Sequence, residues 1–342
     1  MSENKLVNAS IILIGMVVLA VVLQTLQSFL RPFVLAIILS LLLMPVARFS
    51  KKRKIPFFMT IIGLIFVFVF LINSIVSLLV EESSRIDENA LNQKGDIQKA
   101  ITSIQDSASK ISVYGKKLDL SQFLNPEKIS PIITSTIKSL IHAVASIFSE
   151  LFLAVLFMMF LLPSQEMIIE NIGKTMGQAK MKKFRSVLVA TEKSIRDYLY
   201  TKSLISLGTA VVSAIVLLFF KADFILIFGI LFFVLNFIPN VGSFIAVTLA
   251  LLFYSLMYGL GLNVLWLGIL LIIVQVVFSN ILEPKFAGDK LNLSPIVILL
   301  GLFLWFWIWG IMGMILAVPI ISIIKIILEH IDSTKNVARL MS

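Results

Sequence analysis

The chain has 342 residues, of which 59% are hydrophobic and 14% are charged, and its mean hydropathy is +1.03. A soluble domain is closer to half apolar and a quarter charged, so this composition excludes a soluble globular protein. The apolar residues form long continuous runs and do not alternate, which excludes a β-barrel. They predict an all-α polytopic membrane protein with about six to eight transmembrane helices.

The net charge is +10, and the chain has no cysteine and two histidines. The basic residues gather in short loops between apolar runs, which indicates membrane topology and lipid headgroups as partners and not nucleic acid. Without thiols there are no disulfides, no thiol catalysis and no thiolate metal sites. We therefore expect no metal site and no cofactor.

Residues 1–80 predict three membrane spans, at 9–30, 33–47 and 55–80. The sequence ARFSKKRK separates the second span from the third. Cytoplasmic loops carry an excess of lysine and arginine, so this loop predicts that it and the amino terminus are cytoplasmic.

Residues 81–138 form a long polar stretch with eight basic and eight acidic side chains. Zero net charge is typical of an external segment. Isoleucines recur there at helical spacing, at Ile97, Ile101, Ile104 and Ile111, which predicts that part of it is an amphipathic helix.

A fourth span is expected at 139–162, followed by a basic segment, 163–202, with eight basic and four acidic residues. This second segment predicts amphipathic helices at the cytoplasmic membrane surface. The tail, 329–342, is also basic and is expected in the cytoplasm.

Residues 203–328 hold a span at 203–220, another at 262–282, and two interrupted apolar blocks at 224–260 and 294–328. Each block would be about 50 Å long as one helix, too long for a hydrocarbon core about 30 Å thick. We expect each to fold back as a hairpin, either crossing twice or re-entering. The residues expected to break the second block are Pro295, Gly310, Gly313 and Pro319.

Broken helices inside a membrane are tolerated where the backbone is buried in protein or lines a wet cavity. Paired interrupted segments are also the usual sequence sign of a transporter's binding site. The blocks therefore predict a transport core with a polar pocket.

The sequences NFIPNVGSFIA and NILEPKFAGDKLNLSP, with the glycines and proline that follow, resemble the autoinducer-2 exporter family of PerM-like permeases. The family pattern reads IP-x-x-G, E-P, L-x-L-x-P and G-x-x-G-x-x-x-A-x-P. In this chain it falls on Ile238, Pro239, Gly242, Glu283, Pro284, Leu291, Leu293, Pro295, Gly310, Gly313, Ala317 and Pro319. Ser243 stands where members often have a second proline, and Asn240 and Val241 stand where a tyrosine is common.

The resemblance implies a secondary transporter in the cell membrane, with export of autoinducer-2 as the namesake activity. It also implies homo-oligomers, expected to be pentamers, and an elevator-like movement. Some members resemble sodium or lithium/proton antiporters, so Na⁺ and H⁺ are alternative solutes.

The candidate solute-binding residues flank the first break and the end of the 262–282 span. Asparagine and serine at the break could bond a polar solute or cap helix ends, and both readings stay open. Polar residues in the span could bind solute or join helices. The set is Asn236, Pro239, Asn240, Gly242, Ser243, Gln275, Asn280, Glu283 and Pro284.

Two carboxylates are candidate proton or cation carriers, because an ionisable group within a span is costly and is usually functional. Glu283 could instead form a salt bridge with Lys285 or Lys290. Glu150, inside the fourth span, could instead pair with Lys138 or His142.

The leading prediction is a transporter that exports a small polar solute similar to autoinducer-2, and the nearest rival is a cation/proton antiporter. A non-transporting scaffold would not need two broken hairpins. The chain lacks H-E-x-x-H, G-x-S-x-G and a pair of aspartates within a span, so we expect no enzyme activity.

Overall fold

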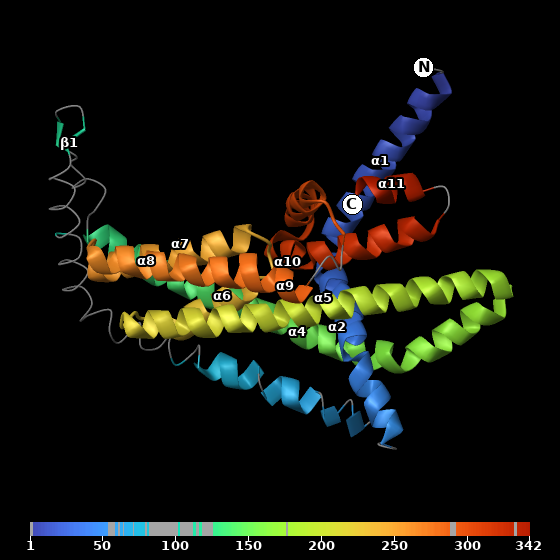
Figure 1. Ribbon diagram of the computed structural model, residues 1–342, viewed down its shortest axis with the longest axis horizontal. Coiled ribbons are helices and arrows are strands. Elements are labelled where there is room, and N and C mark those ends of the chain that lie inside the picture. The colour runs from blue at the N-terminus through green and yellow to red at the C-terminus, as the bar shows by residue number, and fades with distance from the viewer. Residues whose placement is uncertain are drawn as a thin grey trace. The chain divides into compact units, whose positions relative to one another are not determined.

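The computed structural model describes most of the chain, and the remaining residues are drawn in grey in Figure 1. The described residues are 3–53, 59–60, 62–63, 65–70, 72–78, 81, 102, 112–113, 116–117, 126–175, 177–287, 292–331 and 334–342. The expected third span, 55–80, is described only in part, and those residues are helical. The expected amphipathic helix in 81–138, with its four isoleucines, lies outside the described residues.

The elements in chain order are almost all helices (Figure 1). They are α1 (Glu3–Thr25), α2 (Gln27–Lys52), β1 (Ser112–Val113), β2 (Lys116–Lys117), α4 (Pro126–Thr175), α5 (Gln178–Phe219), α6 (Ile225–Leu235), α7 (Val241–Tyr258), α8 (Leu262–Gln275), the π-helix η1 (Val276–Leu282), α9 (Glu283–Ala287), α10 (Pro295–His330) and α11 (Lys335–Leu340). The strands β1 and β2 form a short antiparallel pair.

Within the described residues, five helical segments are long and apolar enough to cross a membrane. They are Ser135–Ser164, Met181–Phe219, Val241–Tyr258, Leu262–Phe286 and Pro295–His330. The count rises to six if the pair Leu13–Thr25 and Gln27–Leu43, bent by 91° at a short break, forms one span. The prediction of an all-α membrane protein is confirmed, and five to six spans among the described residues lie at or just below the lower end of the expected range.

The helix boundaries differ from the sequence prediction at the break between α1 and α2, which falls at Leu26, at the start of α4, which lies inside the expected polar stretch, and in the segment 163–202. The segment 163–202 is not a separate pair of helices, because its residues form the end of α4 and the beginning of α5. The reversal between these two helices lies around Gly177. Charged side chains mark where a helix leaves the membrane, but they do not end it, because lysine, arginine and glutamate are good helix formers.

The chain divides into two compact units. Unit 1 comprises 1–68, 149–200 and 289–342, and unit 2 comprises 69–148 and 201–288. The two interrupted apolar blocks therefore belong to different units.

In unit 1, α10 packs on both α1 and α2. Two side chains fix α1 against α10: Gln24 Nε2 donates to the Trp307 carbonyl at 2.8 Å, and Trp309 Nε1 donates to the Leu23 carbonyl at 3.0 Å. Near the bend, the rings of Phe29 and Phe33 pack edge-on against Phe157 of α4. These contacts hold the bent pair α1–α2 against α4 and α10.

The second hairpin of the sequence prediction is α10, which folds back on itself. Gly310 has φ 66° and ψ −146° and is the non-helical residue inside this helix. An added Cβ at Gly301 would lie 1.9 Å from Ile321 Cδ1, so residues on either side of Gly310 face each other closely. Gly313 and Pro319 lie in the helical limb after the break, and Pro295 begins the first limb. The fold-back therefore takes place at Gly310.

The first hairpin, in unit 2, is formed by α6 and α7, and α7 also packs on α8 (Figure 1). The rings of Phe228 and Phe253, one from each limb, pack at 5.8 Å. Helix α6 has 11 residues, a length of about 16 Å that covers only about half of a hydrocarbon core. The break at 236–240 therefore lies within the membrane's thickness.

After each break comes a glycine, at a position where the surrounding backbone leaves no room for a side chain. An added Cβ would lie 1.7 Å from the Leu235 carbonyl oxygen at Gly242, and 1.9 Å from the Trp305 carbonyl oxygen at Gly313. A backbone atom cannot move aside as the end of a flexible side chain can. These two glycines let each limb pack tightly on the turn before it.

The substitution Gly313→Ala tests this packing. We expect the free energy of unfolding to fall by about 1–3 kcal/mol, the usual range for overpacking, and the melting temperature of the detergent-purified protein to fall with it. Gly15→Ala is the matched control, because an added Cβ there meets nothing within 4 Å. Equal melting temperatures for Gly313→Ala and wild type would contradict this account of the hairpin.

Candidate functional site

A row of polar side chains is buried along one face of α5 in unit 2. Lys202, Ser206, Thr209 and Ser213 recur at steps of four, three and four residues, so they share one helix face. All four are buried, at exposed fractions between 0% and 3%. The segment around them is apolar, so this polar face points into the protein and away from lipid.

The first break, at 236–240, is hydrogen-bonded directly to this row of side chains. Asn236 is 2% exposed, and its Nδ2 donates to Ser206 Oγ at 3.0 Å. Ser243, at the start of α7, lies with its Oγ 3.4 Å from Asn236 Oδ1. A single asparagine thus joins the end of α6, the beginning of α7 and the polar face of α5.

The backbone of the break makes most of its hydrogen bonds within the break. Ile238 N–H donates to the Leu235 carbonyl, and Gly242 N–H donates to the Ile238 carbonyl. Asn240 is exposed, has φ 59° and makes no capping bond with its side chain. Asparagine tolerates positive φ better than most residues, which explains its presence there. Most carbonyls of the break therefore already accept a hydrogen bond within it.

Helix α8 and the π-helix η1 that follows it carry the second set of polar groups. Gln275 is 8% exposed, and neither Nε2 nor Oε1 has a hydrogen-bond partner among the described residues. The buried hydroxyls of Ser279 and of Ser213 on α5 also have no hydrogen-bond partner among the described residues. An unpaired buried polar group costs about 1–3 kcal/mol, so each is a candidate ligand contact.

The π-helix η1 begins directly after Gln275. An added Cβ at Gly208 of α5 would lie 2.4 Å from the ring of Phe278, so α5 and η1 are in close contact. Single π-helical turns are rare and occur often at functional sites. The polar side chains of these two elements therefore lie on packed helices of one unit.

An ion pair closes one end of this polar interior. Lys202 Nζ lies 2.7 Å from both carboxylate oxygens of Glu283, and the two side chains are 4% and 24% exposed. The sequence offers Lys285 and Lys290 as nearby partners for Glu283. The partner is instead a lysine 81 residues earlier, which only the fold brings near.

The other candidate carrier, Glu150, lies in unit 1. Its Oε1 is 3.2 Å from Arg31 Nη1, and Arg31 Nη2 also donates to Gln27. Both side chains are about a quarter exposed. This pairing differs from the partners that the sequence considered, because Arg31 is 119 residues away along the chain.

The structure brings together only part of the predicted set. Asn236, Gly242, Ser243, Gln275 and Glu283 lie buried or half-buried in unit 2. Asn280 and Pro284 are exposed there, as Asn240 is, and Pro239 is half-buried in the turn. Whether any of these residues touches a solute stays a prediction.

Sequence reasoning missed the polar face of α5 and its lysine. The signal was present, because three hydroxyl residues at helical spacing in an apolar span define a polar face. Gln275 and Asn280 stood in one candidate set, but Gln275 is buried and Asn280 is exposed, whereas Ser279 and Glu283, four and eight residues after Gln275, are half-buried. These steps of four residues place the three side chains on one side of the helix.

A family model for AI-2E family transporters matches residues 10–333. The chain belongs to the AI-2E family of transporters. It is 27% identical over 338 residues to the AI-2 transport protein TqsA of Escherichia coli (strain K12), covering 97% of this chain and 95% of that protein.

Two further relatives carry broader names. A protein of Borreliella burgdorferi is 30% identical over 311 residues, covering 91% of this chain and 83% of its own length. YhhT of Escherichia coli (strain K12) is 35% identical over 149 residues, or 44% of this chain and 42% of its own. Their names assign transport provisionally and give no substrate. The comparisons establish an integral membrane transporter.

The ion pair of unit 2 predicts a dependence on both partners. Lys202 is buried but the Glu283 side chain is 24% exposed, so leaving the carboxylate unpaired in Lys202→Met should lower the free energy of unfolding by about 1–3 kcal/mol. The double variant Lys202→Met/Glu283→Gln removes the unpaired charge and should recover most of that loss. Chemical denaturation in detergent measures both. Equal stability of the single and double variants would contradict a buried, interacting pair.

Proposed function

We propose that this transporter carries a small, uncharged, hydroxyl-bearing solute, similar to autoinducer-2, out of the cell. The solute would pass through the polar interior of unit 2. The observation that carries the proposal is the Gln275 amide, which is buried with no partner among the described residues. A carbonyl and an amino group held unpaired in an apolar helix suit a ligand with hydroxyl groups, which both donate and accept.

The charge of this interior also favours a neutral solute. Lys202 neutralises Glu283, and Ser206, Thr209 and Asn236 carry no charge. A free cation would need an unpaired carboxylate or several oxygens directed at one point. Hydrogen-bonding groups without net charge instead suit a small polar molecule. The name of the relative TqsA supports autoinducer-2 as the first solute to test.

The proposal includes an orientation in the cell membrane. The basic loop at 48–54 and the basic tail support cytoplasmic amino and carboxyl termini. It also includes a homo-oligomer, which is expected for this family.

The substitution Gln275→Leu separates a binding role from a structural one. It removes two unpaired buried polar atoms at similar volume, so we expect the melting temperature to rise. If the amide holds solute, efflux of autoinducer-2 from proteoliposomes should fall at least about tenfold, the cost of about one hydrogen bond to solute.

Asn263→Leu is the matched control, because this amide on α8 is exposed. It should leave efflux unchanged. A Gln275→Leu variant that is more stable and still transports at the wild-type rate would remove Gln275 from the binding site.

Cation/proton antiport is the second candidate, because a carboxylate and an ammonium group in contact within membrane helices can exchange a proton. Proteoliposomes with an imposed pH gradient distinguish the two functions. We expect autoinducer-2 flux without a sodium-driven change of internal pH. A sodium-driven pH change that Glu283→Gln abolishes, with no autoinducer-2 flux, would replace the proposal with antiport.

A further inference from the structure

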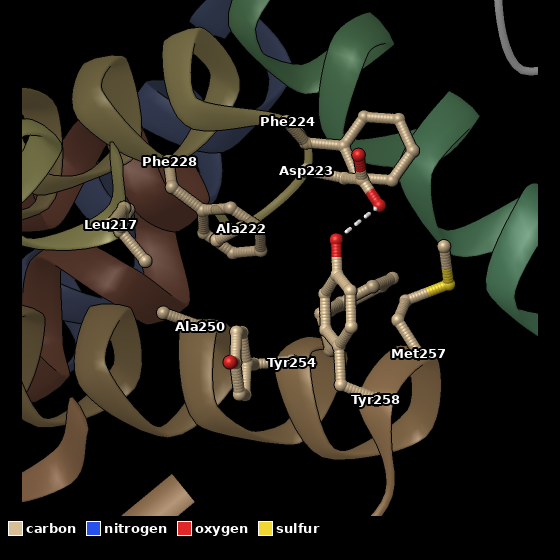
Figure 2. Close-up of a pocket in the computed structure, with 10 residues that line it drawn as sticks. Leu217, Ala222, Asp223, Phe224, Phe228, Ala250, Tyr254, Met257 and Tyr258 are labelled. Carbon is tan, nitrogen blue, oxygen red and sulfur yellow. Dashed lines mark hydrogen bonds between the residues drawn. The ribbon is translucent and has the colours of Figure 1, made fainter. Parts of the chain in front are cut away.

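A small hollow lies at the end of unit 2 where α5 turns into α6. It is partly open to the outside. Its walls come from the end of α5, the turn at 220–224, the start of α6 and the last turns of α7 (Figure 2). The apolar span Met181–Phe219 ends directly before this turn, which therefore lies where lipid headgroups begin.

The turn is held in one conformation. Lys221 and Phe224 both have positive φ, at 54° and 59°, which is unusual for these residue types. The Tyr258 hydroxyl lies 2.8 Å from Asp223 Oδ2 and 2.9 Å from the Lys221 carbonyl oxygen, so these two acceptors share its single hydrogen. Tyr254 Oη donates to the Phe220 carbonyl at 3.3 Å. Two tyrosines of α7 thus fix the turn and its carboxylate.

The hollow combines aromatic walls with one negative charge. Figure 2 shows the Asp223 carboxylate directed toward the Tyr258 hydroxyl, with the ring of Phe224 beside it and those of Phe228 and Tyr254 lining the wall. Aromatic faces attract ammonium groups through their quadrupole, and cages of such rings are a usual way to bind them. A carboxylate among the rings adds the complementary charge.

We propose that this hollow binds the ammonium group of a phospholipid headgroup, with phosphatidylethanolamine as the ligand. Asp223 and the surrounding rings would hold the ammonium group. Lys221, exposed two residues earlier, supplies the opposite charge near the lipid phosphate. The same chemistry would take a free amine, so the experiment includes both sources.

The hollow lies at the opposite end of α7 from the break at 236–240. Helix α7 has 18 residues, with the break before its first residue and Tyr258 as its last. Its two ends are therefore about 27 Å apart. The inference does not rest on the proposed function, and failure of one leaves the other intact.

The test measures the melting temperature of the full-length protein in detergent as lipid is added. The probes are phosphatidylethanolamine, phosphatidylglycerol, which has no amine, and free ethanolamine. We expect phosphatidylethanolamine to stabilise the protein at concentrations about tenfold lower than phosphatidylglycerol does. Native mass spectrometry of the purified protein independently measures which lipid the protein retains.

Asp223→Asn is the decisive variant, because asparagine can still accept the Tyr258 hydrogen bond but carries no charge. It should keep its melting temperature without lipid and lose the preference for phosphatidylethanolamine. Glu170→Gln, on the exposed Lys174–Glu170 pair of α4, is the matched control and should keep the preference.

Three results would each decide the question. Equal effects of the two lipids on wild type, or an unchanged preference in Asp223→Asn, would overturn the proposal. A variant that simply unfolded would show a lower melting temperature before any lipid was added; in that case Phe224→Leu, which removes a ring and keeps the charge, replaces it and must weaken the preference. Stabilisation by free ethanolamine equal to that by lipid would support the ammonium site and overturn the lipid as its ligand.

Discussion

Polar groups that leave water for a membrane interior must find partners inside the protein, and unit 2 depends on that constraint. Its central contact is the hydrogen bond from Asn236 to Ser206. This contact joins the broken end of α6 to the polar face of α5, and Ser243 extends it to α7. Without it, a buried amide would face apolar side chains at the point where the backbone is already interrupted.

The same constraint explains where function can lie. Several buried polar groups that the structure describes in unit 2 are paired: Lys202 with Glu283, Asn236 with Ser206, Thr209 with its own helix. The exceptions among the described residues are Gln275, Ser213 and Ser279, which come from facing elements of the same unit. Paired groups build the scaffold at low cost, and the unpaired groups are the ones left free to exchange partners with a solute.

The two hairpins use similar means to reverse direction. Each has a residue with positive φ at the break, Asn240 in one and Gly310 in the other. Each also has a glycine two or three positions later whose missing Cβ leaves room for a carbonyl of the preceding limb. The asparagine and glycine pattern in the sequence therefore reflects the backbone geometry of the two breaks.

The sequence alone determined the membrane class, the helical architecture, the two hairpins and the family, because apolar runs and helix-breaking residues act locally along the chain. It could not pair Glu283 with Lys202, or Glu150 with Arg31, because these contacts join residues 81 and 119 positions apart. It also could not show that Gln275 is buried whereas Asn240 and Asn280 are exposed. Which face of a helix is buried depends on what packs against it, and only the tertiary structure decides that.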